Sequence, residues 1–355
     1  MNIEQAILIS DTHFGFKNGS PEWLEIQKDY FNNFFIPLIK KYKSKNSVLF
    51  ILGDLFDHRT NLNLQVMNTS LEIIEKLSEL INIFILIGNH DIFNKSTNSI
   101  NSLKLFKYLP NIKIFEEPEN LKLSNGKSIF LMPWINNYND EKETVLNNKA
   151  DYLFAHTEFK GYHNTKHSIV NEGQEIENFK NYKKVFSGHI HLRQEYKNFT
   201  LIGSPYSMSR SDIDNKKGIY ILDTNNFKQE FIENNYSPEF KKLQLKDTLN
   251  INLENFKNLI KNNFVDIISN NSDLLSLFFN KISELSLNCK RLEPILLNEY
   301  DINIQNFEEA INQDYSEFNI VDLTNNFIDE LPYNQTKKTE LKDIINNLYL
   351  KTKEN

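Results

Sequence analysis

Mainly apolar runs alternate with helical patterns along the N-terminal third of the chain. The runs Gln5–Ser10, Val48–Leu52 and Ile83–Ile87 are nearly continuous in apolar residues, which predicts strands buried on both faces. Between them, residues 21–43 and Val66–Leu80 repeat apolar side chains three and four positions apart, the spacing of a helix that packs one face. This β-α-β order predicts a parallel sheet whose loops after the strands gather on one edge.

Polar residues that can bind metals follow each of these predicted strands. They are Asp11 and His13 after the first, Asp54 and Asp57 after the second, and Asn89, His90 and Asp91 after the third. One such turn alone would also fit a solvated histidine. We expect Gly88 to supply the backbone freedom for the third turn, and Asp91 to hold the neighbouring histidine in place.

The same arrangement continues along the chain. Further strands are predicted at Asn111–Phe115, Ser128–Met132, Asp151–Ala155, Lys184–Ser187, Thr200–Ile202 and Gly218–Leu222. His156 follows one of them directly, and His189 and His191 follow another. Packing gives no reason for such repeated strand ends, whereas oxygen and imidazole ligands suit Mn, Fe or Zn. Two metals ~3.5–4 Å apart need a carboxylate that contacts both, and Asp54 is the natural bridge.

Composition narrows the class of protein. A chain of 355 residues exceeds the ~250–300 residues of a single core, so more than one domain is expected. Cys289 is the only cysteine, which fits a reducing cytoplasmic compartment. No export signal or run of ~20 apolar residues is present, so we expect a soluble protein without membrane contact. The net charge of −7 argues against coating nucleic acid by bulk charge.

The motifs together resemble the calcineurin-like metallophosphoesterase superfamily. The resemblance covers residues 5–222 and implies an α/β fold, with a β-sandwich core, βαβ units and flanking helices. It implies in-line attack by a metal-bridging hydroxide, with His90 stabilising the transition state or assisting the leaving oxygen, and Asp57 orienting a metal-bound imidazole. It assigns Asp11, His13, Asp54 and His191 to one divalent metal, and Asp54, Asn89, His156 and His189 to the other.

Further motifs resemble the double-strand-break repair nucleases, namely the bacterial SbcD subunit and the Mre-type nucleases. They include Met132–Trp134 and Gly203–Pro205 with Arg210, and the likeness is strongest to the recombination endonuclease subunit of T-even phages. It implies a manganese-dependent DNA exonuclease and endonuclease, with Mg²⁺ or Fe²⁺ as alternative metals. It also implies a homodimer that acts with an SbcC-type coiled-coil ABC ATPase, in the host cytoplasm if the protein is phage-encoded. Archaeal relatives tend to carry histidine at the Asp57 position.

A cationic rim around the metal site would let a DNA backbone bind there, although solvated charges are the plain alternative. Histidines 58, 163 and 167 have no assigned role. The rim consists of Lys17, Arg59, Lys95, Lys160, Lys166, Arg193 and Arg210.

The predicted domains are a nuclease domain over 1–235, a capping domain over 236–318 and a helix-loop-helix over 319–355. In the cap, the patterns predict strands at Phe240–Leu245, Val265–Ile268 and Tyr300–Ile304 and helices at Leu253–Ile260 and Leu274–Leu285. This is a small α+β domain, which in the family helps to shape the DNA groove. The last segment predicts helices at Ile320–Leu331 and Thr336–Leu350, which either fold back on the cap or bind the ATPase.

Two other functions remain open. A protein phosphatase or cyclic-nucleotide phosphodiesterase would use the same ligands. A subunit that mainly assembles the ATPase on DNA would not need them, and the complete ligand set argues against it.

Overall fold

The computed structural model describes residues 1–94, 97–166, 168–283, 287–297, 337–339 and 341–342. The chain divides into two units, Met1–Asn298 and Glu299–Asn355, and the fold described below is that of the first. The predicted strand Tyr300–Ile304 and helix Ile320–Leu331 lie outside the described residues. Within Thr336–Leu350, the described residues 337–339 and 341–342 are helical. The domain boundaries at 235 and 318 stay predictions.

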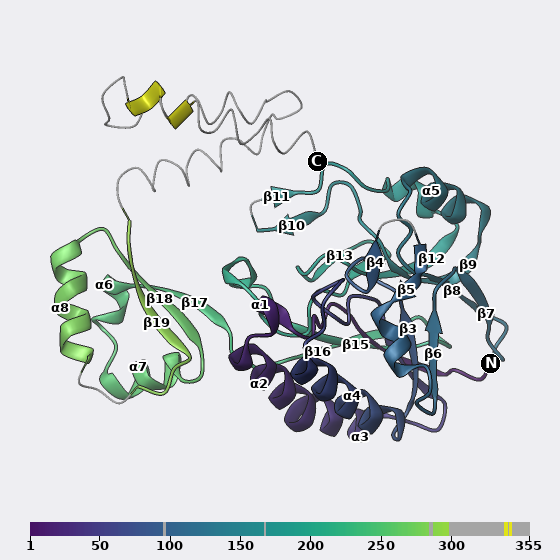
Figure 1. The fold of residues 1–355 in the computed structure, drawn as a ribbon, viewed down its shortest axis with the longest axis horizontal. Coiled ribbons are helices and arrows are strands. Elements are labelled where there is room, and N and C mark those ends of the chain that lie inside the picture. Colours follow the sequence, from purple (N-terminus) through teal and green to yellow (C-terminus); the bar gives the residue numbers. More distant parts are fainter. Residues whose placement is uncertain (95–96, 167, 284–286, 298–336, 340, 343–355) are drawn as a thin grey trace. The chain divides into compact units, whose positions relative to one another are not determined.

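The first sheet contains the predicted parallel strands (Figure 1). Its strand order is β16-β15-β1-β2-β3-β6, and the four strands from β1 to β6 in this order run parallel. The antiparallel strands β15 and β16 complete the sheet beside β1. The bounds are β1 Gln5–Ile9, β2 Ser47–Ile51, β3 Asn82–Leu86, β6 Ile112–Phe115, β15 Gly218–Asp223 and β16 Gln229–Glu233. The parallel βαβ prediction is confirmed.

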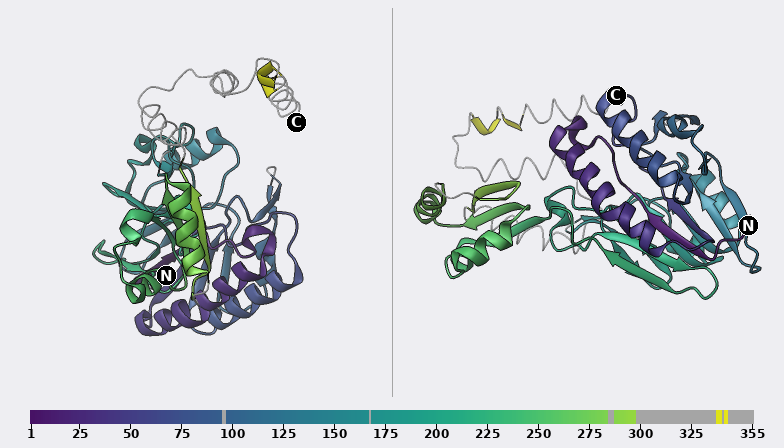
Figure 2. Two further views of the ribbon diagram at one scale, coloured as in Figure 1. Left: turned by 90° about the vertical axis from the view of Figure 1, so that its left-hand side faces the viewer. Right: turned by 90° about the horizontal axis from the view of Figure 1, so that it is seen from below.

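Helices cover one face of this sheet, where α2–α3 and α4 lie side by side (Figure 2). The expected helix over 21–43 contains a π-helical segment, Tyr30–Phe35, between α2 and α3. Pro37 lies at the start of α3, and its missing N–H interrupts the regular hydrogen-bond ladder there. The bounds are α1 Phe16–Gly19, α2 Pro21–Asp29, α3 Ile36–Tyr42 and α4 Leu64–Ser78.

A second sheet packs on the other face, in the order β13-β14-β12-β9-β8-β7. The two sheets enclose an apolar layer, in which the Phe50 and Phe154 ring centroids lie 4.9 Å apart. This confirms the β-sandwich. The bounds are β7 Glu119–Lys122, β8 Ser128–Met132, β9 Ala150–His156, β12 Tyr182–Gly188, β13 Gln194–Tyr196 and β14 Phe199–Leu201. Helix α5 (Tyr138–Asn147) and two hairpins, β4–β5 (Ile92–Asn94, Thr97–Asn101) and β10–β11 (His163–Thr165, Ser168–Ile169), complete this part.

A third sheet of parallel strands follows, in the order β17-β18-β19. The sequence patterns did not predict β19, because its residues alternate weakly and Pro294 lies within it, a residue that favours edge strands. The bounds are β17 Phe240–Gln244, α6 Leu245–Thr248, α7 Leu253–Ile260, β18 Phe264–Ser269, α8 Ser272–Ile282 and β19 Arg291–Leu296. Among the described residues, no helix is both long and apolar enough to cross a bilayer.

Candidate metal centre

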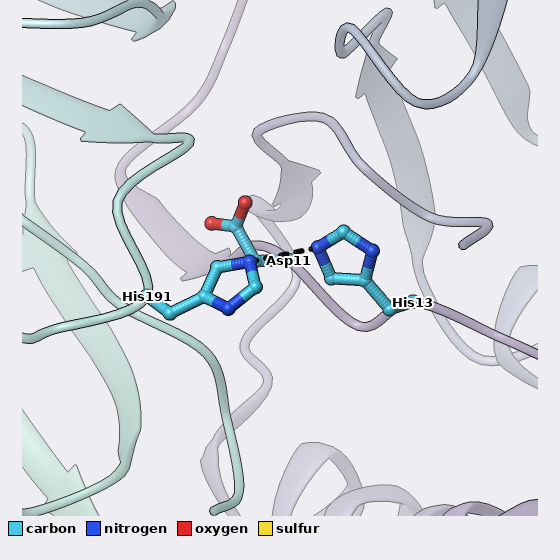
Figure 3. Close-up of side chains that lie close together, drawn as sticks. All are labelled: Asp11, His13 and His191. Atoms are coloured by element: carbon cyan, nitrogen blue, oxygen red, sulfur yellow. Dashed lines mark hydrogen bonds between the residues drawn. The ribbon is translucent and has the colours of Figure 1, made fainter. Parts of the chain in front are cut away.

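The loops after β1, β2, β3, β9 and β12 meet at one edge of the sandwich, because these strands end on the same side. They bring together all seven predicted metal ligands in two groups, of which Figure 3 shows the first. Asp11, His13, Asp54 and His156 are each at most 1 % exposed. That these residues are metal ligands stays a prediction.

The first group contains Asp11, His13 and His191, whose ligand atoms lie within 4.8 Å of one another. The His13 Nε2 and His191 Nε2 atoms are 2.9 Å apart. Asp54 Oδ2 lies 3.7 Å from His13 Nε2. Two imidazole nitrogens and carboxylate oxygens that face one another in a buried space provide lone pairs for a cation.

The second group contains Asp54, His156 and His189, together with Asn89. Asn89 Oδ1 lies 2.9 Å from both His156 Nε2 and His189 Nδ1. Asp54 Oδ2 lies 3.4 Å from His156 Nε2. The same carboxylate oxygen therefore faces both groups, as a bridging ligand must.

Burial and neighbouring charges set the protonation of these groups. Burial lowers the pKa of His189 to about 3, with the positive charge of His156 adding to the effect. Burial and His13 likewise hold the pKa of His191 well below its usual range. Burial opposes ionisation of Asp54, but the facing His156 and His13 still lower the pKa of that carboxyl. Burial opposes protonation of His156, but the facing Asp54 raises the pKa of this imidazole to about 9. A divalent metal binds only deprotonated ligands, so it would displace the proton of His156, whereas His189 and His191 are already neutral.

The outer contacts of the ligands are specific. Asp57 Oδ1 lies 3.3 Å from His13 Nδ1, close to the predicted orienting contact. His156 Nδ1 lies 2.7 Å from the Leu52 carbonyl oxygen, and such contacts fix the ring and its tautomer. The backbone at Asp11, His13, Asp54 and His189 has positive φ angles of 53°, 45°, 51° and 82°, which are costly for non-glycine residues and concentrate at functional sites.

His90 lies beside these two groups and forms a third cluster of possible ligands with His13 and Asp57. Its Nδ1 is 2.7 Å from the Asp57 carbonyl oxygen, and its backbone N–H donates to Asp54 Oδ1 at 2.8 Å. The His90 and His13 ring centroids are 4.9 Å apart. The Asp57 carbonyl therefore fixes this imidazole at Nδ1.

Two expectations about this turn are wrong. Gly88 does not have a positive φ; a Cβ there would lie 2.2 Å from Asp54 Oδ1 and 2.3 Å from Asp54 N, so glycine is required for close approach. Asp91 does not hold the histidine. It accepts the backbone N–H groups of Leu55 and Phe56 at 3.1 Å and thereby fixes the loop that carries Asp54.

Sequence patterns missed two buried residues that support the ligand loops. Gln27 on α2 donates to the carbonyl oxygens of Thr12 and His13 at 3.0 and 2.7 Å. Lys217 donates to the His191 carbonyl oxygen at 2.7 Å and pairs with Asp212 at 2.5 Å. The only signal in the sequence was a polar residue on an otherwise apolar helix face at position 27, and position 217 had none.

Most of the predicted cationic rim is neutralised. Lys17 and Arg59 have no carboxylate partner among the described residues, and Lys95 lies outside them. His58 Nε2 lies 3.8 Å from Asp57 Oδ2. The exposed His163 belongs to no ligand group in the described part of the chain, and His167 lies outside it. The ion pairs are Lys160–Glu175, Lys166–Asp214, Arg193–Glu195 and Arg210–Asp266.

The sandwich with this donor set at its edge defines a metal-dependent phosphoesterase. The chain belongs to the calcineurin-like phosphoesterase family, whose pattern matches residues 6–193. It is 30% identical over 234 residues to exonuclease subunit 1 of Enterobacteria phage T4, a match that covers 64% of this chain and 67% of that protein.

Two weaker similarities accompany this one. The protein 078R of Invertebrate iridescent virus 3, whose name as a phosphoesterase is provisional, is 25% identical over 203 residues; the match covers 54% of each chain, so this chain spans about half of that relative. A crystal structure of a protein of unknown function from Aquifex aeolicus is 18% identical, covering 54% of this chain and 82% of the other, with a TM-score of 0.29.

Proposed function

We propose that this phosphoesterase is a DNA nuclease that hydrolyses phosphodiester bonds with two divalent metals, Mn²⁺ in the first place and Mg²⁺ or Fe²⁺ as alternatives. The observation that carries the proposal is the pair of donor groups that share Asp54 Oδ2. The likeness to a phage exonuclease subunit supports DNA as the substrate. The work of such an enzyme would be DNA end processing, recombination and repair, inside the host cell if a phage encodes it.

In this mechanism, the predicted ligands would bind two metals. Asp11, His13, Asp54 and His191 would hold one metal, and Asp54, Asn89, His156 and His189 the other. A bound metal pair lowers the pKa of a water molecule and polarises phosphoryl oxygens. The remaining residues prepare the site for the substrate: Asp57 keeps His13 oriented, and the burial of the ligands excludes bulk water.

His90 is the residue that we place at the leaving oxygen. Because Nδ1 donates to the Asp57 carbonyl oxygen, Nε2 is the atom left to face the substrate. In the imidazolium form, Nε2–H can donate a proton to the leaving oxygen or a hydrogen bond to the charge that develops on phosphorus.

A direct assay tests the function. Purified full-length protein with Mn²⁺ or Mg²⁺ is given labelled duplex and single-stranded DNA, a phosphoprotein and a cyclic nucleotide. We expect metal-dependent cleavage of DNA, stopped by a chelator and by Asp54→Asn. Cleavage of the phosphoprotein or cyclic nucleotide instead would favour the other phosphoesterases, and DNA binding without any hydrolysis would favour an assembly subunit.

The proposed partners are a second copy of the chain and an SbcC-type coiled-coil ABC ATPase. Support comes from the relative in phage T4, which is named as a subunit. Truncation after Phe318 is expected to leave metal-dependent nuclease activity and to abolish capture of the ATPase in a pull-down. Retained capture would place the binding surface elsewhere on the chain.

A further inference from the structure

A cavity of about 430 Å³ opens between the loop that follows β1 and the loop that precedes α4. Its apolar wall comes from Phe14, Leu62 and Val66, and polar side chains complete it. Gly15 and Gly19 keep the two loops close, because a Cβ at Gly15 would lie 3.1 Å from Val66 and one at Gly19 would lie 2.1 Å from Asn63. The cavity is thus built into the packing of two loops and α4.

This cavity is connected to the metal centre through Asp57, whose Oδ2 lies 3.8 Å from Nε2 of the lining residue His58. Phe14 directly follows the predicted ligand His13, and His58 directly follows Asp57. The pair between them, His13 Nδ1 and Asp57 Oδ1, is 3.3 Å apart. His90 Nδ1 lies on the Asp57 carbonyl oxygen at 2.7 Å. Asp57 thus links the cavity wall to His13 and to His90, the residue that we place at the leaving oxygen.

The charges around the cavity favour an anionic ligand. Lys17 lies beside the lining residue Asn18, and Arg59 lies between two lining residues, His58 and Thr60. Neither cation has a carboxylate partner within the described ranges, and Lys17 Nζ lies 5.3 Å from the centroid of the Trp23 ring. The other rim cations that the structure describes are paired, as Lys160 is with a carboxylate at 2.8 Å. Phosphate groups that approach the centre are thus attracted most strongly from the cavity side.

We propose that this cavity is a nucleotide subsite, which holds the nucleoside next to the scissile phosphate on the leaving side. Leu62 is the apolar lining residue with accessible surface for the face of a base, since Phe14 and Val66 behind it are buried. The amides of Asn18 and Asn61 and the imidazole of His58 can hydrogen bond to the edge of the base. Because a base must leave its duplex partner to enter, the substrate is DNA with an unpaired nucleotide at the cut. This proposal rests on the proposed nuclease function and adds the position of the bound nucleotide.

The test has two parts: abasic substrates remove the base from the DNA, and tryptophan substitutions in the protein fill the cavity. Oligonucleotides with one natural phosphodiester among phosphorothioate linkages carry an abasic residue on its 5′ side, on its 3′ side or on neither. We expect the kcat/KM of the wild-type protein to fall about 10-fold or more for one of the two abasic substrates, the scale of losing one well-held base. Asn61→Trp and Thr60→Trp, which fill the cavity, are each expected to cleave all three substrates within about twofold of one another.

Asn147→Trp, an exposed substitution on α5, is the matched control and keeps the wild-type discrimination. Metal content and melting temperature are measured for each variant, so that a misfolded protein is recognised and the other filling variant is used. Equal cleavage of intact and abasic DNA by the wild type, or unchanged discrimination in both filled variants, overturns the subsite but leaves the nuclease function standing. Failure to cleave intact DNA overturns both.

Salt dependence tests the two cations. Lys17→Gln and Arg59→Gln are each expected to lower the slope of log K against log salt for single-stranded DNA by about 0.7. Lys160→Gln, which removes a cation that is already paired with Glu175, serves as the control and leaves the slope unchanged. If the slopes of the Lys17→Gln and Arg59→Gln variants do not change, the proposal that DNA phosphates approach from the cavity side is contradicted.

Discussion

Two neighbouring residues, His90 and Gly88, fix the position of the Asp54 carboxylate. Its Oδ1 accepts the backbone N–H of His90 at 2.8 Å, which leaves Oδ2 facing both donor groups. Gly88 passes so close that any side chain at position 88 would meet this carboxylate. The metal centre therefore requires glycine at position 88 as well as its ligands.

Gly88→Ala tests this close approach. The added Cβ would lie 2.3 Å from the Asp54 backbone nitrogen, so the loop after β2 must shift and the carboxylate moves out of position. We expect loss of at least one Mn²⁺ per chain, measured by mass spectrometry of bound metal. Gly126→Ala, whose Cβ meets nothing within 4 Å, is the control. The positive φ at position 126 strains this variant locally, but we expect it to keep both metals. Full metal content in Gly88→Ala would contradict the prediction.

His90→Asn separates chemistry from metal binding. His90 clusters with His13 and Asp57 but is not one of the seven predicted ligands. The variant is therefore expected to keep two Mn²⁺ ions and to lose about 10²–10⁴-fold in kcat, the usual contribution of a general acid. Bound metal and DNA hydrolysis are measured on the same sample. His163→Asn changes an exposed histidine and is expected to stay within about twofold of wild type. Unchanged turnover in His90→Asn would contradict the role of His90 as general acid.

At the scale of elements, buried polar side chains join neighbouring segments behind the metal centre. Glu141 on α5 hydrogen bonds the hydroxyl of Thr157, just beyond β9, and accepts from Gln174 Nε2 at 2.9 Å. Burial raises the pKa of this carboxyl to about 7, from an ordinary value of 4.5, although these hydrogen bonds oppose the shift. The position of α5 is therefore linked to the protonation of one carboxyl group.

The sign of this linkage predicts a pH dependence. Between pH 4.5 and about 7 the folded protein retains a proton on Glu141 that the unfolded chain has released, so stability falls as pH rises through this window. In urea unfolding of the metal-free protein from pH 5 to 8, we expect wild type to lose on the order of 3 kcal/mol relative to Glu141→Gln. Glu143→Gln, on the exposed face of α5, should follow wild type; a parallel pH profile for Glu141→Gln would refute the assignment.

At the scale of the whole first unit, the third sheet contacts the sandwich through an aromatic cluster on α2. The Trp23 ring stacks on Phe264 with centroids 5.4 Å apart and on Phe240 at 6.3 Å. Arg210 adds a bidentate pair with Asp266 at 2.6 and 2.8 Å. One helix turn beyond Trp23, Gln27 holds the loop of Asp11 and His13, so α2 contacts both the third sheet and the metal centre.

Trp23→Ala is expected to lower the free energy of unfolding by about 3–5 kcal/mol, as for other buried aromatic residues, and to expose residues 237–297 to protease. Urea unfolding and timed proteolysis measure the two effects. Trp23→Phe keeps a ring and should lose less. Arg210→Ala should cost about 1 kcal/mol or less, because the guanidinium is half exposed and solvent screens such pairs. A larger cost for Arg210→Ala than for Trp23→Ala would contradict this order.

The sequence by itself determined all strands of the sandwich except the edge strands β7, β13 and β16. It also determined the helices that precede β2 and β3, and the strand ends that carry Asp11, Asp54, Asn89, His156 and His189. These are local properties, because apolar runs and their periodicity reflect burial and strand ends follow from chain order. The same local signals failed at β19, where Pro294 interrupts the pattern, and at the π-helical turn before Pro37.

Only the tertiary structure decided which side chains support the metal centre and which of the surrounding cations are paired with carboxylates. Gln27 and Lys217 act on carbonyl oxygens that are distant in sequence, and Gly88 and Asp91 act on the loop of Asp54. The neutralisation of Lys160, Lys166 and Arg210 likewise depends on carboxylates from other segments. Such contacts form between chain segments that meet only on folding, so no pattern of neighbouring residues records them.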